Sequence, residues 1–397
     1  MLRSLDISNS EHLKAEFNHI GVNPGGMDIM VPKGQFYIFK TDRISHSASV
    51  LLKDQMLKLN AECAISREAV KTSEEKHPVI MMGTREHYKK LVDKLNTENY
   101  PELSKIVQDL KNFFATRSSG CLKIRGNKYD LDKKTLIMGI LNITPDSFSD
   151  GGQFNNQDDA VKEALKMENQ GADIIDIGGE STRPGAEPVT LDEELNRVLP
   201  VIKGIREKSQ IPISIDTYKA EVADRALSAG ADIVNDISGL RFDKNMAETV
   251  AEHKVPVILM HIKGEPRNMQ DNPEYENIFD EILEYFDKSI NIALEAGISR
   301  EQIILDPGFG FGKKWEDNYR LLKHLKEFKS PGYPLLIGTS RKSFIGNILD
   351  LPVDQRLEGT LATITAGIMN GADIIRVHDV KEAVRVIKVT DKIIGKR

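Results

Sequence analysis

The sequence is poor in cysteine and has no long apolar run. Only Cys63 and Cys121 occur among its 397 residues. Two thiols without a neighbouring Cys–His cluster argue against a disulfide framework and a structural zinc site. No apolar run is long enough to span a bilayer, and residues 1–14 carry no apolar signal core. We therefore expect a cytoplasmic protein without a membrane partner.

Basic residues are not in excess either. The chain has 54 Lys and Arg against 60 Asp and Glu, a net charge of −6, so no basic surface argues for a nucleic-acid partner. The sequence contains no Walker A pattern, no HExxH and no Gly-x-Ser-x-Gly. Nucleotide hydrolysis, zinc proteolysis and serine-hydrolase chemistry are therefore not proposed. The hydrophobic content of 40% is that of a globular protein.

A repeated strand-and-helix pattern begins at Leu136. Residues 136–141 are apolar and partly β-branched, as in a strand buried on both faces, and a long polar loop follows directly. The pattern continues with predicted strands at 172–179, 211–216, 231–236, 255–261, 303–306, 334–338 and 372–378. About eight such units over roughly 260 residues predict an α/β fold, a (β/α)8 TIM barrel. An open doubly wound sheet is the alternative, but no Gly-rich dinucleotide fingerprint follows the first strand.

Residues 1–120 do not follow this pattern. They predict a small α/β domain with strands at 35–39 and 79–82, helices at 47–60, 86–95 and 102–114, and an irregular glycine-rich stretch at 21–34. Residues 121–131 alternate apolar and polar residues around Gly126-Asn127, which predicts a hairpin that leads into the barrel. We expect this hairpin to close the end away from the active site. The predicted domains are therefore 1–120, whose role the sequence does not indicate, and 121–397.

Polar residues follow the apolar runs at the strand ends, where the active site of a parallel barrel lies. Asp216, Asn235 and Asp306 offer acceptors and a donor on rigid strands, a set that suits a planar heterocycle with amide and amino groups. Lys342 can donate to such a ring, and Phe311 adds aromatic surface. Each residue alone also has an ordinary interpretation as a helix N-cap, a solvated cation or a core residue. Together they favour a binding site.

A second group lies where the last predicted strand neighbours the first. Arg376, His378 and Asn142 can converge there, and this combination suits a phosphate or diphosphate group. Asn142 can also supply an oxygen to Mg²⁺. For Arg376 or His378 alone, a surface arginine or a packed histidine is the simpler interpretation. Asp379 is predicted to cap the last helix.

From residue 121 onward the sequence resembles the dihydropteroate synthases, the folate-pathway family inhibited by sulfonamides. The matching motifs follow the family's order and span the whole predicted barrel: NITPDSFSDGG (142–152), GGESTRPGAEPV (178–189), SIDTYKAEVA (214–223), IVNDISG (233–239), ILMH (258–261), DPGFGFGK (306–313), GTSRKSFIG (338–346) and RVHDV (376–380). A series of motifs in one order is far more specific than any one of them.

The resemblance implies a transferase. 4-Aminobenzoate displaces diphosphate from (7,8-dihydropterin-6-yl)methyl diphosphate and gives 7,8-dihydropteroate. The resemblance implies that the pterin is held by Asp216, Asn235, Asp306 and Lys342, with Met260 beside it. It implies that the diphosphate and its Mg²⁺ are held by Asn142, Arg376 and His378. It also implies that the aminobenzoate pocket is shaped by Phe148, Thr182, Arg183, Pro184 and Ser343. Asn142, Lys342, Arg376 and His378 are the implied catalytic residues. A homodimer is also implied.

Two features depart from the family. The loop after His261 has Glu265 and Asn268 where threonine-like residues are expected, and residues 1–120 resemble an extension found only on some longer members. Two rival functions stay open: a pterin-dependent methyltransferase acting on a corrinoid protein, and a barrel that binds pterin without turnover. The loop from Asn142 and the segment 376–378 favour the synthase, because a diphosphate leaving group needs that end of the barrel.

Overall fold

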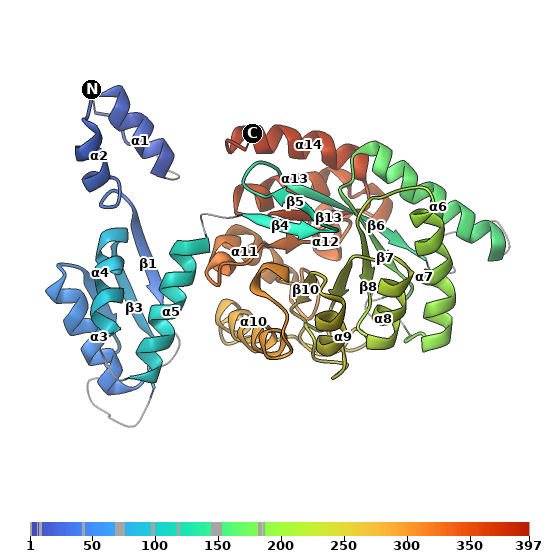
Figure 1. Ribbon diagram of the computed structural model, residues 1–397, viewed down its shortest axis with the longest axis horizontal. Helices are drawn as coiled ribbons and strands as arrows, with labels where there is room; N and C mark the ends of the chain where they lie inside the picture. Colours follow the sequence, from blue (N-terminus) through green and yellow to red (C-terminus); the bar gives the residue numbers. More distant parts are fainter. Residues whose placement is uncertain are drawn as a thin grey trace. The chain divides into compact units, whose positions relative to one another are not determined.

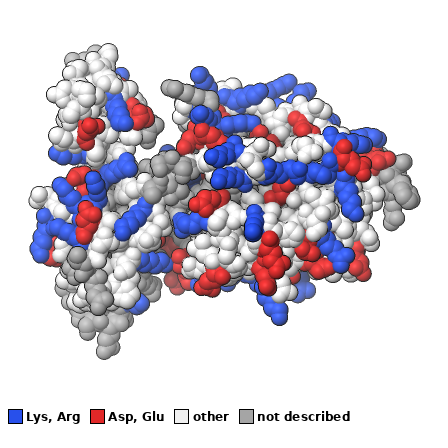
Figure 2. All heavy atoms as spheres, in the orientation of Figure 1, with Lys and Arg blue, Asp and Glu red and all other residues white. Residues whose placement is uncertain are grey.

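The chain forms two compact units, Met1–Ala115 and Thr116–Arg397 (Figure 1). The computed structural model describes residues 2–5, 7, 10–41, 44–67, 76–96, 100–116, 120–143, 153–181, 185 and 187–396. Among the helices in these ranges, none has both the length and the apolar character needed to cross a bilayer. Figure 2 shows acidic and basic side chains interspersed over the face in view, in keeping with the nearly balanced composition.

The N-terminal unit is built on a three-stranded antiparallel sheet in the order β1-β3-β2. Its elements are α1 (Ser10–His19), α2 (Pro24–Met30), β1 (Phe36–Lys40), α3 (His46–Lys58), β2 (Glu62–Ile65), β3 (Val79–Thr84), α4 (Arg85–Leu95) and α5 (Pro101–Thr116). Its core joins Met81 of β3 to Leu52 of α3 and Leu91 of α4.

One expectation for this unit was wrong, because the glycine-rich stretch 21–34 contains a helix. α2 begins at Pro24, whose fixed φ suits a first helical position. The side chain of Asn23 caps the helix by accepting a hydrogen bond from the Gly26 N–H at 2.7 Å. Local capping therefore overrides the low helix propensity of two glycines in this short segment.

The second unit is a barrel of eight parallel strands surrounded by helices (Figure 1). Its repeating elements are β6 (Leu136–Asn142), α6 (Gln153–Gln170), β7 (Ile174–Gly178), α7 (Leu191–Arg206), β8 (Ile213–Asp216), α8 (Ala220–Ala229), β9 (Ile233–Asp236), α9 (Met246–His253), β10 (Val257–Met260), α10 (Ile278–Glu295), β11 (Ile303–Asp306), α11 (Trp315–Lys323), β12 (Leu336–Ile337), α12 (Ser343–Leu349), α13 (Leu357–Met369), β13 (Ile374–Val377) and α14 (Val380–Ile393).

The ring of strands closes, and so the predicted (β/α)8 barrel is confirmed and the open sheet is excluded. β13 pairs with β6, which joins the last strand to the first. β11 and β12 meet through a bridge between Leu305 and Leu335, where the Leu305 N–H donates to the Pro334 carbonyl at 2.9 Å. The short helix α12 was not predicted from the sequence.

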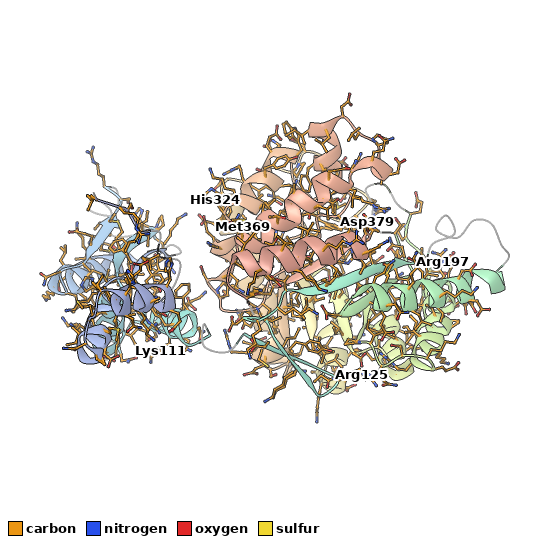
Figure 3. All side chains as sticks on the ribbon, turned by 90° about the horizontal axis from the view of Figure 1, so that it is seen from above. Lys111, Arg125, Arg197, His324, Met369 and Asp379 are labelled. Atoms are coloured by element: carbon orange, nitrogen blue, oxygen red, sulfur yellow. The ribbon has the colours of Figure 1, made fainter. Side chains whose placement is uncertain are left out.

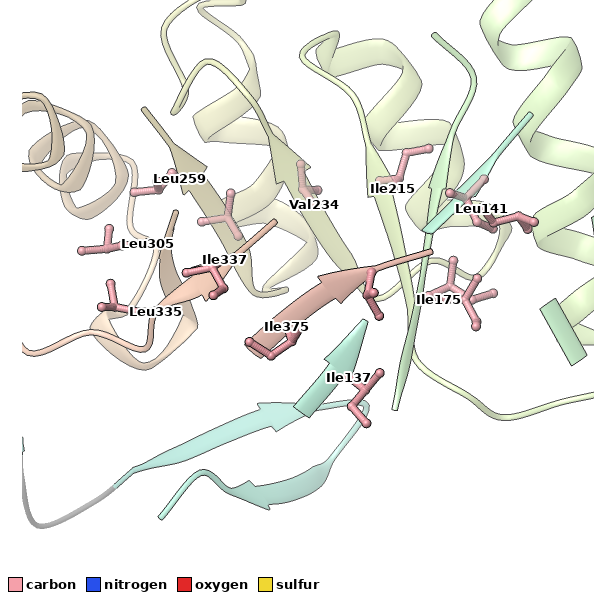
Figure 4. Close-up of a cluster of buried hydrophobic side chains, with 14 of the residues drawn as sticks. Ile137, Leu141, Ile175, Ile215, Val234, Leu259, Leu305, Leu335, Ile337 and Ile375 are labelled. Carbon is pink, nitrogen blue, oxygen red and sulfur yellow. The ribbon is translucent and has the colours of Figure 1, made fainter. Parts of the chain in front are cut away.

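Alternation along each strand separates two environments. One set of side chains points outward and packs beneath the helices, including Ile137, Ile175, Ile215, Leu259 and Ile375 (Figure 4). The other set points into the barrel, where a lower layer is also apolar and includes Ile174, Ile233, Ile304 and Ile374. Two residues further along the same four strands stand Asp176, Asn235, Asp306 and Arg376. The two-residue period therefore places a polar layer directly above an apolar one, at the carboxyl ends of the strands.

A Gly-Ala-Asp turn recurs at the amino-terminal end of the barrel strands. The aspartates of residues 171–173, 230–232 and 371–373 each accept a backbone N–H from the neighbouring strand: Asp173 from Ile137 at 3.0 Å, Asp232 from Ile213 at 2.9 Å and Asp373 from Leu335 at 2.8 Å. Each carboxylate also pairs with a basic side chain: Asp173 with Lys134, Asp232 with Arg206 and Asp373 with Lys329. The glycine that begins each turn has a positive φ, the left-handed conformation in which many α-helices end.

The predicted hairpin is present as β4 (Cys121–Ile124) and β5 (Asn127–Asp130). Its Leu122 and Ile124 are buried in the lower apolar layer of the barrel. The turn residue Arg125, labelled in Figure 3, donates to Asp232 and Gln210, which precede β9 and β8. The hairpin therefore closes the amino-terminal end of the barrel, opposite the polar layer.

Candidate active site

The carboxyl end of the barrel carries a buried polar layer. Asp216 and Asn235 stand opposite each other on the paired strands β8 and β9, and Met260 stands opposite Asp306 on β10 and β11. Asn235 is 4% exposed and Asp306 5% exposed. Buried polar groups need partners, so an arrangement of this kind at a barrel mouth favours ligand binding over packing. The structure thus brings together the residues predicted to hold the heterocycle.

Arg376 lies at the centre of this layer, between two carboxylates. Its Nε donates to Asp176 Oδ2 and its Nη2 donates to Asp216 Oδ2, both at 2.6 Å. Asn235 Nδ2 donates to the same carboxylate, at 3.2 Å from Oδ2 and 3.4 Å from Oδ1. Asp176 is fully buried. A single carboxylate therefore orients both the arginine and the amide.

Asp176 was not among the predicted site residues. It was read as part of the second strand, within a run of isoleucines. The signal that marks it is its position two residues after Ile174, which gives it the same inward direction as Arg376 two residues after Ile374. A lone carboxylate on the inward side of a buried strand needs a cation or a donor, and Arg376 and Asn235 supply them.

Burial raises the pKa of two aspartates of the layer, Asp216 and Asp306. It raises the pKa of Asp216 to about 7, against the opposing effect of the nearby Arg376 cation. It raises the pKa of Asp306 to about 6, although the carboxylate accepts the Gly308 N–H at 2.8 Å. Burial by itself lowers the pKa of Arg376, but Asp176 and Asp216 outweigh it, and the net shift is upward. The arginine is therefore cationic, while the pKa values of Asp216 and Asp306 are both raised.

The backbone of the loop after Asp306 lies directly against the backbone of the loop after β10. Gly308 has φ +69°, and a Cβ there would lie 2.0 Å from the His261 carbonyl oxygen, so only glycine fits. Phe311 packs in a small apolar cluster with Met260, Ile237, Ile262 and Met269. Lys342 Nζ lies 4.1 Å from the centre of the Phe311 ring. The predicted residues Met260, Phe311 and Lys342 therefore share one side of the site.

Lys313 is a buried cation beneath this loop. Its Nζ contacts His261 Nδ1 at 2.9 Å and donates to the carbonyls of Gly308 at 2.8 Å and Phe311 at 3.0 Å. These three acceptors match the three N–H groups of an ammonium. Burial lowers the pKa of Lys313 to about 7. Lys313 therefore joins the loops that follow β10 and β11.

His378 is held by Ser340. The Ser340 Oγ accepts the His378 backbone N–H at 3.2 Å and lies 2.9 Å from His378 Nδ1. The hydroxyl has two acceptor lone pairs and one hydrogen, so it can accept the backbone N–H and also bond to Nδ1 in either tautomer of the ring. Burial and the nearby cation Arg376 lower the pKa of His378 to about 3. The imidazole is therefore neutral at physiological pH.

Asp379 does not cap the last helix in the predicted way. It occupies the position before α14, but its side chain makes no capping hydrogen bond. Its carboxylate binds Arg341 instead, with Arg341 Nε donating to Oδ2 at 3.0 Å. That prediction was wrong because a bidentate arginine offers the carboxylate stronger hydrogen bonds than a backbone N–H does.

The predicted aminobenzoate residues are described only in part. Phe148, Thr182, Arg183 and Pro184 lie outside the described residues. Ser343 begins α12. It lines a hollow of about 400 Å³ together with Gly310, Gln270 and Trp315. The described lining of this hollow includes Gly310, from the loop after Asp306, but not Asp216, Asn235, Asp306 or Lys342.

The residues that flank 182–186 are firmly anchored. Lys219, which follows β8, donates to Glu180 Oε2 at 2.6 Å, to the Val189 carbonyl at 2.7 Å and to Glu194 Oε2 at 2.6 Å. Tyr218 donates to Glu180 Oε1 at 2.7 Å. One lysine therefore ties the described residues on both sides of this segment to the strand that ends at Asp216.

Comparison with known proteins places this site in a family. Residues 138–378 match the model of the pterin binding enzymes. The dihydropteroate synthase of Clostridium beijerinckii is 53% identical over 274 residues, which cover 69% of this chain and 99% of that protein. A solved structure of dihydropteroate synthase from Clostridium difficile, in the presence of pteroic acid, is 51% identical with a TM-score of 0.64 and covers 68% of this chain and 100% of that one.

A third relative extends beyond the barrel. The probable bifunctional folylpolyglutamate synthase/dihydropteroate synthase of Halobacterium salinarum is 38% identical over 386 residues, which cover 97% of this chain and 46% of that protein. That match includes the N-terminal unit. The fold and the polar layer define a pterin-binding barrel enzyme. The chain belongs to the dihydropteroate synthase family, a group of transferases of folate synthesis.

Proposed function

We propose that the barrel condenses (7,8-dihydropterin-6-yl)methyl diphosphate with 4-aminobenzoate to give 7,8-dihydropteroate and diphosphate. The observation that carries this proposal is the polar layer of Asp216, Asn235, Asp306 and Arg376, with Asn235 and Asp306 buried, at the carboxyl end of a barrel of this family. The layer offers hydrogen-bond acceptors for a flat ring and a cation for an anionic leaving group in one place.

The pterin would lie against Asp216, Asn235, Asp306 and Lys342. Asn235 turns its Nδ2 to Asp176, so its Oδ1 is the atom left to accept from a ring amine or amide. Asp216 and Asp306 add carboxylate acceptors, and Lys342 adds a donor for a ring carbonyl or nitrogen. This pattern complements an aminopyrimidinone edge, which carries adjacent N–H donors and one carbonyl. Met260 and Phe311 supply apolar contact to the ring faces.

The diphosphate would take the opposite side of the layer. Arg376 offers a charged fork, and His378 offers a neutral imidazole. Arg376 binds Asp216 without ligand. Pterin binding to Asp216 would free the Nη2 of the arginine for the leaving group, while the bond from Nε to Asp176 keeps the guanidinium in place.

The reaction breaks the bond between the pterin methylene carbon and the diphosphate oxygen. Positive charge develops on the methylene, and the amine nitrogen of 4-aminobenzoate attacks it and loses a proton. The buried carboxylates stabilise the charge on the pterin, and Arg376 and His378 stabilise the departing diphosphate. Fixed charges in a dry site are the largest contribution such a site makes. No covalent bond to the chain is needed.

Mg²⁺ is part of the proposal through Asn142. The Oδ1 of Asn142 and the Oδ2 of Asp216 each lie 3.7 Å from the point where a Cβ on Gly178 would stand. A glycine there leaves space between the two oxygens, which fits a cation that prefers oxygen ligands. Among the described residues no cluster of three or more His, Cys, Asp or Glu could hold a metal ion, so diphosphate oxygens and water would supply the other ligands. When bound, Mg²⁺ supplies charge neutralisation to the diphosphate.

The second substrate would enter over Ser343, with Phe148, Thr182, Arg183 and Pro184 around it. The hollow at Ser343 and Gly310 supports this placement, because it adjoins Phe311 and Lys342. A homodimer and a cytoplasmic location belong to the same proposal and rest on the family resemblance and the sequence. Mass measurement of the purified chain in solution tests the dimer.

One assay tests the function. The purified chain is incubated with the pterin diphosphate, 4-aminobenzoate and Mg²⁺, and dihydropteroate and free diphosphate are both measured. Equal amounts of the two products support the proposal. Pterin binding without either product would refute it and would favour the methyltransferase or the binding-only barrel.

A further inference from the structure

The loops after β12 and β13 are joined by a bidentate ion pair. Arg341 Nε donates to Asp379 Oδ2 at 3.0 Å, and Arg341 Nη2 donates to Asp379 Oδ1. Asp379, labelled in Figure 3, follows His378 directly. Two parallel bonds between a planar fork and a carboxylate fix orientation as well as distance. The proposed function uses neither residue.

Arg341 has an unusual backbone. Its φ is +57°, in the left-handed region that non-glycine residues rarely adopt. Neighbouring side chains hold it there: the Arg341 N–H donates to Thr360 Oγ1 at 3.0 Å, and Arg356 Nη1 donates to the Arg341 carbonyl at 3.1 Å. A strained residue held from several sides marks a position where the surrounding structure requires that conformation.

The strained turn directs its two neighbours to different parts of the site. Ser340, before the turn, bonds to both the backbone N–H and Nδ1 of His378. Lys342, after the turn, carries its ammonium over the Phe311 ring. Arg341 therefore stands between a residue that holds the proposed diphosphate ligand and a residue that is itself a proposed pterin ligand.

We propose that Arg341 and Asp379 are a positioning pair, whose ion pair fixes the pterin-holding Lys342 relative to the diphosphate-holding Arg376 and His378. This inference rests on the proposed function. Neither residue is among the proposed substrate ligands. The bond that breaks joins the pterin to the diphosphate, so the two sets of ligands must keep a fixed separation while it breaks. A displacement of about 1 Å costs on the order of 100-fold in rate.

Arg341→Gly tests the pair without disturbing the turn. Glycine adopts positive φ without strain, so the backbone conformation is retained and only the guanidinium is lost. We expect kcat to fall about tenfold or more. The Kd for 6-hydroxymethyl-7,8-dihydropterin, which lacks the diphosphate, stays within twofold of wild type, and Tm stays within about 2 °C. A kcat within twofold of wild type, or a kcat that falls only in step with Tm, would overturn the proposal.

Asp350→Gly is the matched control. Asp350 has φ +54° at the end of α12, is exposed, and makes no part of the proposed site. The same backbone change there is expected to leave kcat within twofold of wild type. Loss of kcat in this control comparable to that of Arg341→Gly would show that the effect comes from the backbone and would overturn the assignment.

Asp379→Asn completes a double-mutant cycle. Asparagine keeps the shape of the side chain and is also a favourable residue before a helix, so α14 retains its start. The single variant is expected to lose kcat as Arg341→Gly does, and the double variant to lie within twofold of Arg341→Gly. Losses that multiply in the double variant would show that the two residues act independently. Wild-type turnover, measured alongside, separates failure of this inference from failure of the proposed function.

Discussion

The positive charge of Arg376 is balanced by carboxylates of the same site. The guanidinium is shared between Asp176 and Asp216, so the ligand-free layer has no bare buried charge at the arginine. Such pairs contribute little net stability, but loss of one partner leaves the others without compensation. The two carboxylates therefore keep the guanidinium paired, and we expect substrate to replace one of these partners.

Arg376→Ala should lower kcat/KM for the pterin diphosphate by about 100-fold or more, because it removes the charged fork from the leaving group. The Kd of 6-hydroxymethyl-7,8-dihydropterin should change much less, since that ligand carries no diphosphate. Steady-state rates and equilibrium binding measure the two effects. Arg376→Lys serves as the control: it keeps the charge without the fork, and intermediate activity is expected. An unchanged kcat/KM in the alanine variant would refute the diphosphate role.

Asp306 should give the fold a pH dependence that Asp306→Asn removes. Burial raises the pKa of Asp306 to about 6 in the folded chain, against about 3.9 in an unfolded chain. The folded state therefore holds the proton more tightly, and this group's contribution to stability falls as pH rises from about 4 to 6. Asparagine cannot ionise, so Tm of the variant relative to wild type should rise by a few degrees over that range and then level off.

Calorimetry between pH 4 and 8 makes this comparison, with Asp159→Asn as an exposed control whose difference from wild type should stay flat. A Tm difference for Asp306→Asn that falls with pH would contradict the assigned direction. The same variant should also lose pterin binding, because the amide presents an N–H where the carboxylate presents only acceptors.

At the residue scale, position in a strand predicted more than residue type did. Asp216, Asn235 and Asp306 could be found because each ends an apolar run, and the structure places them in one layer. Asp176 and Lys313 could not, since one is hidden within isoleucines and the other reaches its acceptors only after the loop has folded. The bond from Arg376 to Asp216 also depends on a pairing between distant strands.

At the level of the elements, the barrel repeats the same Gly-Ala-Asp turn between a helix and the strand that follows it. Each aspartate satisfies an N–H of the adjacent strand that the ladder leaves without a partner. The repeat was visible in the sequence as a glycine cap and a strand start. The carboxylate's bond to the next strand was not, because it depends on the register between strands.

Asp173→Ala should therefore destabilise the barrel by about 1–3 kcal/mol, the usual cost of leaving a buried N–H without its acceptor. KM for both substrates should stay within twofold, since the turn lies at the end opposite the site. Denaturant unfolding and steady-state kinetics give the two values. Asp159→Ala, an exposed residue paired with Lys162, should change stability by less than about 0.5 kcal/mol. Equal losses in both variants would count against the assigned role.

Strand order was predictable because the barrel repeats one unit, whereas the short elements were not. The eight strands follow apolar runs, and their closure follows from their number and parallel arrangement. α2 and α12 escaped prediction because each is a single short helix set by its local caps and neighbours rather than by an apolar period.

For the whole molecule, the two compact units predict that the barrel is independent. Deletion of residues 1–115 should leave a folded Thr116–Arg397 with kcat/KM within about threefold of the full chain, because the proposed site residues all lie in the second unit. Calorimetry and the product assay test this. Complete loss of soluble protein would show that the first unit is needed for folding, and a folded but inactive barrel would show that it contributes to catalysis.

The hairpin closes the lower end of the barrel, and this affects the route by which ligands reach the site. In the described part of the barrel the hairpin fills the lower end, so we expect ligands to reach the polar layer from the opposite end. The proposed pterin ligands lie deepest there, and Ser343 lies nearer the surface. We therefore expect the pterin substrate to bind before the aminobenzoate. A competitor of 4-aminobenzoate would then bind only the pterin-loaded enzyme, and its inhibition would be uncompetitive toward the pterin substrate.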